Sequence, residues 1–255
     1  MEHRLIQHGL VDSTSSRAFA DLAAGTARHG DVHLARGQSA GRGREGHTWL
    51  SPTDEGLYAS IVLLPDPPAL RPTALTMACA LATLESLRDL GLDPFGDGAA
   101  QLKWPNDIQV GGAKLCGILT ESRSLAPARP HFVVGIGMNV RQLQFPAELK
   151  AERAVTSLAL LGHKVTVAAA TEALLGRLGG RLAQVRGHHR ELADDYLLAS
   201  GLGEQRVRVT CSGEERVGQL VGLSVSSGLE LRGNGPRSEF LPLEFIQAVS
   251  RDELD

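Results

Sequence analysis

The hydrophobic pattern of this chain changes its period at Gly201-Leu202-Gly203, and this change constrains the fold more than any other feature. Before it, residues 166–200 carry apolar side chains at helical spacing, which predicts helix. After it, short runs alternate polar and apolar residues, at 206–210, 216–221 and 229–232. Alternating strands joined by tight turns are typical of a small β-barrel. We therefore expect a large domain over residues 1–202 and a small barrel over residues 203–255.

The larger domain combines strand-like and helix-like segments. Apolar or alternating runs predict strands at residues 31–36, 57–64, 108–110, 115–121 and 132–140. Residues 73–90 repeat apolar side chains at helical spacing, and Gly91 stands where a C-cap belongs, so we expect a packing helix there. A chain of 255 residues with 42% hydrophobic content is long enough to bury a core of this kind.

The overall charge and the cysteines exclude several classes of protein. A net charge of -3 provides no general basic face for duplex DNA, although a local arginine cluster can still bind one anionic ligand. The cysteines, Cys79, Cys116 and Cys211, lie far apart without metal-ligand spacing, so we expect reduced thiols in a cytoplasmic protein. No run of 18 apolar residues and no apolar leader after Met1 occurs, so we expect neither a membrane span nor export.

Residues 36–49 form a stretch whose composition suits neither a helix nor a strand. The segment Gly41-Arg42-Gly43-Arg44-Glu45-Gly46 allows close approach of a ligand to the backbone, and its arginines suit phosphate or carboxylate. Its glycine spacing also matches the fingerprint of dinucleotide-binding folds, but that fold needs a helix directly afterwards. The sequence before Pro52 leaves no room for one, so we interpret the stretch as a binding loop of another kind.

The segment Asp12-Ser13-Thr14-Ser15 precedes an apolar-periodic run and is typical of a helix N-cap. Capping uses one side chain and leaves further hydroxyl groups unexplained. On the residues alone, Ser13 and Thr14 either cap the helix or face a ligand.

Lysine is rare in this chain, since only four of its 26 basic residues are lysine. Gly111-Gly112 predicts a hairpin, which places Lys103 and Asn106 around one turn and Lys114 at the base of the next strand. These two lysines are either ordinary surface cations or charges for an anionic substrate. With the arginine loop they suit phosphate chemistry in which the protein positions and neutralises its substrates.

Two carboxylates lie near these cations in the sequence, Asp107 and Glu121. They can hold Mg²⁺ or orient an arginine, and an ion pair between Asp107 and Arg44 is the structural alternative.

Five motifs of the chain, taken in order, resemble those of biotin protein ligases over residues 10–255. They are Asp12-Ser13-Thr14-Ser15, Gly41-Arg42-Gly43-Arg44-x-Gly46-x-x-Trp49, Lys103-Trp104-Pro105-Asn106-Asp107, Lys114-x-x-Gly117-Ile118-Leu119-x-Glu121 and Gly135-Ile136-Gly137-x-Asn139. The resemblance implies an α+β catalytic domain with a mixed sheet, similar to class II aminoacyl-tRNA synthetases, and an SH3-like C-terminal barrel.

The chemistry implied by the resemblance is a two-step acyl transfer. The biotin carboxylate attacks the α-phosphate of MgATP, which yields biotinyl-5'-AMP and pyrophosphate. A lysine of a biotin carboxyl carrier protein or domain then accepts the biotinyl group. About ten residues precede Asp12, so we expect no DNA-binding domain and no DNA partner. The resemblance also makes a homodimer possible.

The resemblance assigns roles to individual residues. Catalysis would involve Lys114, Arg42 and Lys103. The biotin site would comprise Ser13, Thr14, Ser15, Gln38, Gly41, Arg42, Gly43, Arg44, Lys114, Gly117 and Gly135. The ATP or adenylate site would comprise Arg44, Trp49, Asn106, Asp107 and Asn139. No metal ligand is assigned, and Mg²⁺ would accompany the nucleotide.

Some positions depart from the family pattern. Several members carry arginines where this chain has Glu45 and His47, which puts one phosphate contact and the nucleotide affinity in question. A lipoate ligase shares the chemistry, but its arginine-rich and glycine-triplet motif is absent. A catalytically silent binding protein is the other alternative, against which both lysines and both loop arginines argue.

Overall fold

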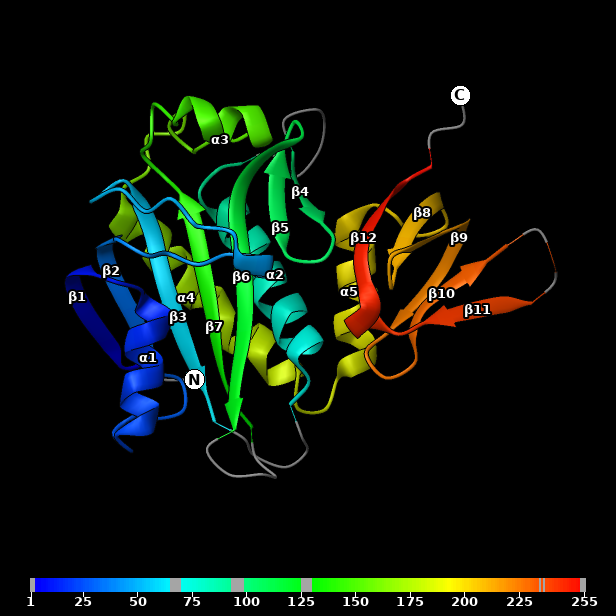
Figure 1. Ribbon diagram of the computed structural model, residues 1–255, viewed down its shortest axis with the longest axis horizontal. Helices are drawn as coiled ribbons and strands as arrows, with labels where there is room; N and C mark the ends of the chain where they lie inside the picture. The colour runs from blue at the N-terminus through cyan, green and yellow to red at the C-terminus, as the bar shows by residue number, and fades with distance from the viewer. Residues whose placement is uncertain are drawn as a thin grey trace.

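The strands of the protein form two separate sheets in the computed structural model, which describes residues 3–64, 70–92, 99–124, 130–233, 235 and 237–252 (Figure 1). The larger sheet has seven strands in the order β1-β2-β3-β7-β6-β5-β4. Their bounds are β1 Leu5–Val11, β2 Val32–Gln38, β3 Gly56–Leu63, β4 Ala100–Lys103, β5 Asp107–Val110, β6 Ala113–Ser124 and β7 Pro130–Asn139. The sheet is mixed, because β1 and β2 run parallel and the other neighbours antiparallel.

The five predicted strands of this sheet are confirmed, whereas β1 and β4 lie outside the predicted set. Both additional strands stand at the two edges of the sheet. An edge strand has a neighbouring strand on one side only and is less buried, so its hydrophobic pattern is weaker. Every residue of β1 is exposed or half-buried.

Helices cover both faces of the larger sheet. Their bounds are α1 Thr14–Ala23, α2 Pro72–Asp89, α3 Ala147–Glu152, α4 Val167–Gln184 and α5 His189–Ser200. Helices α2 and α4 lie behind the sheet in Figure 1, and α1 packs on the opposite face against β2, β3 and β7. Strand β3 is therefore buried at all eight positions, as its continuous apolar run predicts.

The predicted helix over residues 73–90 is confirmed as α2, and the helical pattern over residues 166–200 is confirmed as two helices. The chain forms α4 and α5 with a break at residues 185–188. Glycine at position 187 disfavours helix, and the turn directs α5 toward the C-terminal sheet, where it contacts β9. Helical spacing continues across the break, so periodicity alone does not reveal it.

The C-terminal residues form an open sheet of five strands, so the expected closed barrel is wrong. The strands are β8 Arg206–Cys211, β9 Glu214–Ser224, β10 Gly228–Arg232, β11 Ser238–Leu241 and β12 Ile246–Arg251. Their order is β11-β10-β9-β8-β12, so the described parts of β11 and β12 stand at opposite edges and do not pair. The three predicted strands are confirmed, and β11 and β12 are additional.

The two sheets meet through side chains of α5 and of the turn after β4. Trp104 packs edge-on against Tyr196, with ring centroids 5.8 Å apart, and its Nε1 donates to the carbonyl oxygen of Ile246 at 3.3 Å. Tyr196 in turn donates to the carbonyl oxygen of Pro105 at 3.2 Å. One continuous cluster of buried apolar residues therefore extends from the larger sheet into the smaller one. None of the described helices has the length and apolar content needed to cross a membrane.

Candidate active site

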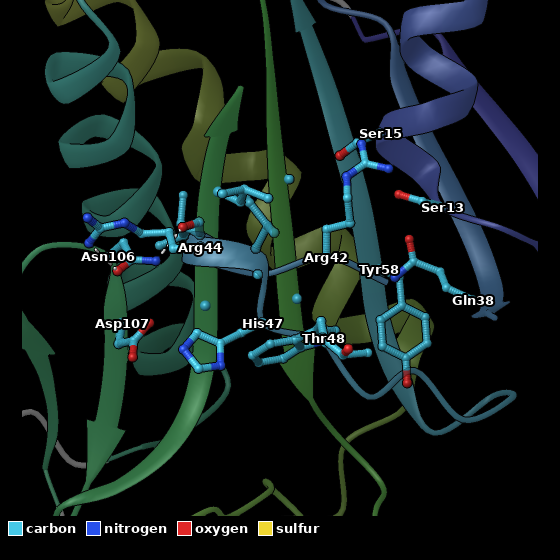
Figure 2. Close-up of a pocket in the computed structure, with 18 of the residues that line it drawn as sticks. Ser13, Ser15, Gln38, Arg42, Arg44, His47, Thr48, Tyr58, Asn106 and Asp107 are labelled. Atoms are coloured by element: carbon cyan, nitrogen blue, oxygen red, sulfur yellow. Dashed lines mark hydrogen bonds between the residues drawn. The ribbon is translucent and has the colours of Figure 1, made fainter. Parts of the chain in front are cut away.

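A cavity of about 210 Å³ lies on the face of the larger sheet, beneath the loop that follows β2. The loop crosses in front of β3, β7 and β6, as Figure 1 shows, and its arginines reach into the cavity in Figure 2. The cavity gathers thirteen of the predicted site residues. They are Ser13, Thr14, Ser15, Gln38, Arg42, Gly43, Arg44, Trp49, Asn106, Asp107, Lys114, Gly117 and Gly135.

One end of the cavity is built around the first turn of α1. Ser13 occupies the N-cap position in an extended conformation, yet its side chain makes no capping hydrogen bond. The backbone N–H and the hydroxyl of Thr14 both donate to Oε1 of Gln38, at 2.8 and 3.1 Å. Gln38 therefore accepts the hydrogen bond of a backbone N–H at the start of the helix that has no partner within the helix. The Ser13 hydroxyl remains on the cavity wall.

Two serines that the sequence analysis did not single out complete this polar end. Ser60 lies within hydrogen-bond distance of the hydroxyls of Thr14 at 2.7 Å and Ser15 at 3.0 Å. Ser51 accepts from Nε2 of Gln38 at 2.8 Å. The signal for Ser60 exists in the sequence, because it is the one serine inside the apolar run of β3, and a buried hydroxyl there needs a partner. Ser51 lies in the loop and carries no comparable signal.

The arginines of the loop anchor it on two sides of the cavity. Arg42 donates to Ser16 Oγ at 2.7 Å and to both carboxylate oxygens of Glu121 at 3.1–3.2 Å. Arg44 donates to Asn106 Oδ1 at 3.4 Å on the opposite side, as Figure 2 shows. The loop thus spans the cavity between α1 and β6 on one side and the β4–β5 turn on the other.

Glu45 weakens the positive field of this loop. Its carboxylate lies 3.7 Å from the guanidinium of Arg44, and its backbone adopts a left-handed conformation with φ 54°. A non-glycine residue in that region is strained, since its Cβ crowds the carbonyl oxygen. The position therefore combines backbone strain with partial neutralisation of Arg44.

Lys114 is the cation most enclosed by the cavity. Its Nζ lies 2.7 Å from Asp107 Oδ1 and 5.5 Å from the centre of the Trp49 ring. Its backbone is held by hydrogen bonds with Ala154 and Thr156, at 2.9 and 3.0 Å. The expected alternative, an Asp107–Arg44 ion pair, does not form: Asp107 pairs with Lys114, whereas Arg44 lies beside Glu45 and Asn106.

A β-bulge sets the direction of Lys114. In the pairing of β5 with β6, Ile108 opposes Cys116 and Gln109 opposes Lys114, so Leu115 is an extra residue on β6. A bulge of this kind bends a strand and redirects the side chains beside it. Leu115 is fully buried, whereas the Lys114 side chain is 13% exposed on the cavity side.

Glycines on β6 and β7 make room on the sheet surface. A Cβ added at Gly137 would lie 2.4 Å from the Trp49 indole, and one at Gly117 would lie 3.0 Å from it. A Cβ at Gly135 would lie 3.3 Å from the hydroxyl of Ser15. The indole therefore rests directly on glycines of the central strands, and its buried Nε1 has no hydrogen-bond partner among the described residues.

Three predicted site residues do not line this cavity. Gly41 lies beside it, where its carbonyl oxygen accepts from Trp49 N and an added Cβ would meet the Trp49 carbonyl oxygen at 2.5 Å. Asn139 is buried and donates to the carbonyl oxygen of Thr156 at 2.9 Å. Lys103 is exposed at the end of the edge strand β4 and lines a different cavity.

The carboxylates at the site are occupied by cations. Asp107 pairs with Lys114, and Glu121 pairs with Arg42. Within the part of the chain that the structure describes, no group of three His, Cys, Asp or Glu side chains is arranged to hold a metal ion. Of the two interpretations of Asp107 and Glu121, orientation of a cation is the one that the geometry favours.

The cavity can bind a polar ring at one end and an anion at the other. Hydroxyl and amide groups at the start of α1 offer both donors and acceptors, and Arg42 reaches this end through Ser16. Lys114 and Arg44 bring positive charge to the part beside Asp107 and Asn106. Such an arrangement suits a substrate that brings a carboxylate next to a phosphate.

Comparison with known proteins agrees with this geometry. Residues 9–139 match the model of the biotin/lipoate A/B protein ligase family. The biotin--[acetyl-CoA-carboxylase] ligase of Mycobacterium tuberculosis is 36% identical over 80% of this chain and 74% of its own length. The bifunctional ligase/repressor BirA of Bacillus subtilis is 36% identical over 59% of this chain, and the match spans 45% of that relative.

Among solved structures, the biotin protein ligase of Aquifex aeolicus in complex with biotin and ATP aligns with a TM-score of 0.76. The two chains are 26% identical, and the alignment covers 97% of this chain and 99% of the other.

Proposed function

Because this chain belongs to the biotin/lipoate A/B protein ligase family, we propose that it is an ATP-dependent biotin protein ligase. In this proposal it activates biotin with MgATP to biotinyl-5'-AMP and transfers the biotinyl group to a lysine of a carrier protein. The observation that carries the proposal is a single cavity that unites Lys114, both loop arginines and the polar end at α1.

Biotin would bind with its ureido ring at the start of α1. The ring has two N–H donors and one carbonyl acceptor, which side-chain hydroxyls and amides can match. The free Ser13 hydroxyl, the Thr14–Ser15 pair and Gln38 supply these groups. Gly135 leaves space beside Ser15, where any side chain would crowd the ring.

Activation would take place beside Lys114. The ammonium group would leave Asp107 in part and neutralise the biotin carboxylate and the α-phosphate as they approach. A cation about 4 Å from a developing charge stabilises it by about 4 kcal/mol at an effective dielectric of about 20. That stabilisation corresponds to about three decades in rate. A lysine fits this task because its ammonium is a compact point charge.

The loop would then retain the adenylate until the carrier lysine arrives. Arg42 and Arg44 supply two guanidinium forks that match phosphate oxygens, and their anchors at Glu121 and Asn106 hold the loop across the cavity. Exclusion of water would protect the mixed anhydride from hydrolysis. Trp49 would contact the adenine with its ring; its indole N–H is buried against Gly137 and has no hydrogen-bond partner among the described residues.

The finer parts of the proposal concern assembly and organisation. Mg²⁺ would enter with the nucleotide as MgATP, and the acceptor would be a biotin carboxyl carrier domain. The catalytic domain would occupy residues 1–202 in the class II synthetase-like arrangement, and residues 203–255 would form an SH3-like domain in spite of their open sheet. We also propose a cytoplasmic protein without a DNA partner, with a homodimer possible through a free sheet edge.

The direct test of this function is biotin transfer to a purified apo carrier domain. Incubation with MgATP and biotin should add one biotinyl group to one lysine, as measured by mass spectrometry of the intact carrier and its peptides. Parallel reactions without ATP, and with lipoate in place of biotin, are the controls. Modification with lipoate alone would reassign the substrate, and no modification in any mixture would contradict the proposed activity.

A further inference from the structure

Lys103 needs an explanation because the candidate active site does not use it. It is one of only four lysines in the chain, and it stands exposed at the end of β4. No ion pair joins it to another described residue. Strand β4 pairs with β5 alone, so its other edge is open among the described strands.

Lys103 lines a groove of about 950 Å³ between two edge strands, which we call the β4–β12 groove. The strand β12 borders it from the smaller sheet, and helices α2 and α5 form its base. The residues that matter for the argument are Arg88, Gln101, Lys103, Leu198, Ser250 and Arg251. Leu198 is 81% exposed there, which is unusual for a leucine beside a cavity and provides an apolar contact.

The groove carries uncompensated positive charge. Its two carboxylates, Glu85 and Asp195, both accept hydrogen bonds from the single guanidinium of Arg181. Arg251 donates only to the carbonyl oxygen of Gly201, at 3.2 Å, and neither Arg88 nor Lys103 has an ion pair with a described residue. Three cations therefore face solvent without an anionic partner in the part of the chain that the structure describes.

The groove adjoins the active-site cavity through two elements. Lys103 is the direct cross-strand partner of Asp107, and side chains opposite each other in an antiparallel pair point to the same face. Asp107 lies in the active-site cavity, so Lys103 stands on the same face one strand further out. On β12, Gln247 lines the cavity, while Ser250 and Arg251 line the groove. A protein that presents a lysine to the cavity would extend over the groove.

We propose that the β4–β12 groove is the docking surface for an acidic face of the acceptor protein, a conclusion that rests on the proposed function. The three free cations attract carboxylates that flank the acceptor lysine, and Leu198 contacts an apolar side chain among them. A nucleic acid fits less well, because Glu85 and Asp195 share the lining and the chain carries a net charge of -3. Charges at the rim of an interface act mainly on association rate and on its salt dependence.

The test compares Arg88→Glu and Arg251→Glu with the exposed control Lys164→Glu, each in the chain of 255 residues. Biotin-dependent pyrophosphate release measures the first step and confirms folding of each variant. Transfer is then measured to an apo carrier domain of net negative charge and, separately, to hydroxylamine, a small nucleophile that needs no docking. The expected result is a KM for the carrier raised about tenfold by each groove variant and a smaller salt dependence of its transfer rate.

Adenylate formation and transfer to hydroxylamine should remain at the wild-type level in the same groove variants, and Lys164→Glu should change nothing. An unchanged KM for the carrier in both groove variants would overturn the docking surface while leaving the proposed function intact. Binding of a fluorescent DNA duplex that disappears in Arg88→Glu would also overturn it, in favour of a nucleic acid. Absence of pyrophosphate release in the wild type would instead refute the proposed function itself.

Discussion

Lys103 and Lys114 are the same residue type in an arginine-rich chain, yet the fold places them in two different regions. Lys114 stands on the inner strand β6, is 13% exposed and pairs with Asp107 at 2.7 Å. Lys103 stands on the edge strand β4, opposite Asp107 in the ladder, and faces solvent. Both lie close to the same carboxylate, but only one is enclosed with the loop arginines. The difference shows that strand position, more than residue type or motif membership, decides which lysine can act on a bound substrate.

Substitution of the two lysines by alanine should give the largest contrast. Lys114→Ala should reduce the rate of adenylate formation by about 10³-fold, because the enclosed cation is lost beside the reacting phosphate. Lys103→Ala should leave that rate within about twofold, because a solvent-exposed charge is screened. Single-turnover formation of biotinyl-5'-AMP measures both. Equal losses in the two variants would remove the distinction between the two regions.

The next largest effect should appear when the loop loses its second anchor. Arg44→Gly removes the hydrogen bond to Asn106 and one guanidinium from the adenylate, so the intermediate should dissociate at least about tenfold faster. Release of biotinyl-5'-AMP into solution, followed by mass spectrometry of the filtrate, is the measurement. Unchanged retention of the adenylate would show that the loop does not close over it.

A smaller effect is expected at the first anchor. Glu121→Gln keeps the shape of the side chain but removes the charge that orients Arg42, which is about one third exposed in this pair. The loss should be about 1 kcal/mol, or about fivefold in the KM for ATP, since solvent weakens the interaction. The exposed control Glu172→Gln should leave that KM unaltered. If Glu121→Gln behaves like the control, Arg42 does not depend on Glu121 for its position.

The smallest expected effect concerns the reactivity of the cysteine thiols, which reports whether the hairpin that carries Lys114 stays closed. Burial raises the pKa of the Cys116 thiol above its ordinary value, and burial raises the pKa of Cys79 to about 12. A raised pKa suppresses the reactive thiolate, so at pH 8 both should resist a disulfide reagent that labels the half-buried Cys211. Peptide mapping after brief labelling decides this. Rapid modification of Cys116 in the native protein would mean that the hairpin opens.

Much of the larger sheet could be predicted because its strands are long, apolar and separated by recognisable turns. The five central strands and the helix α2 follow from periodicity, and the glycine pair at 111–112 predicts the hairpin between β5 and β6. The site residues of the loop and of the α1 cap could be found because their composition does not fit regular structure.

What could not be predicted depends on register and on tertiary contact. The amino-acid sequence does not indicate the bulge at Leu115 that directs Lys114. The solvent-facing position of Lys103 follows only from the placement of β4 at the edge of the sheet. The partners of Asp107 and Glu121 are separated from them in the chain, so sequence spacing could not choose between metal binding and ion pairing. Closure of the C-terminal sheet likewise depends on pairing between β11 and β12, which alternation does not encode.

The most direct measurement is pyrophosphate release from MgATP in the presence of biotin, of lipoate, or of neither, with each mixture examined for the acyl adenylate by mass spectrometry. The account predicts turnover and biotinyl-5'-AMP with biotin alone. Turnover with lipoate alone would contradict the assignment of the substrate. Absence of pyrophosphate release in all three mixtures would contradict the claim that Lys114 and the loop arginines form a working adenylation site.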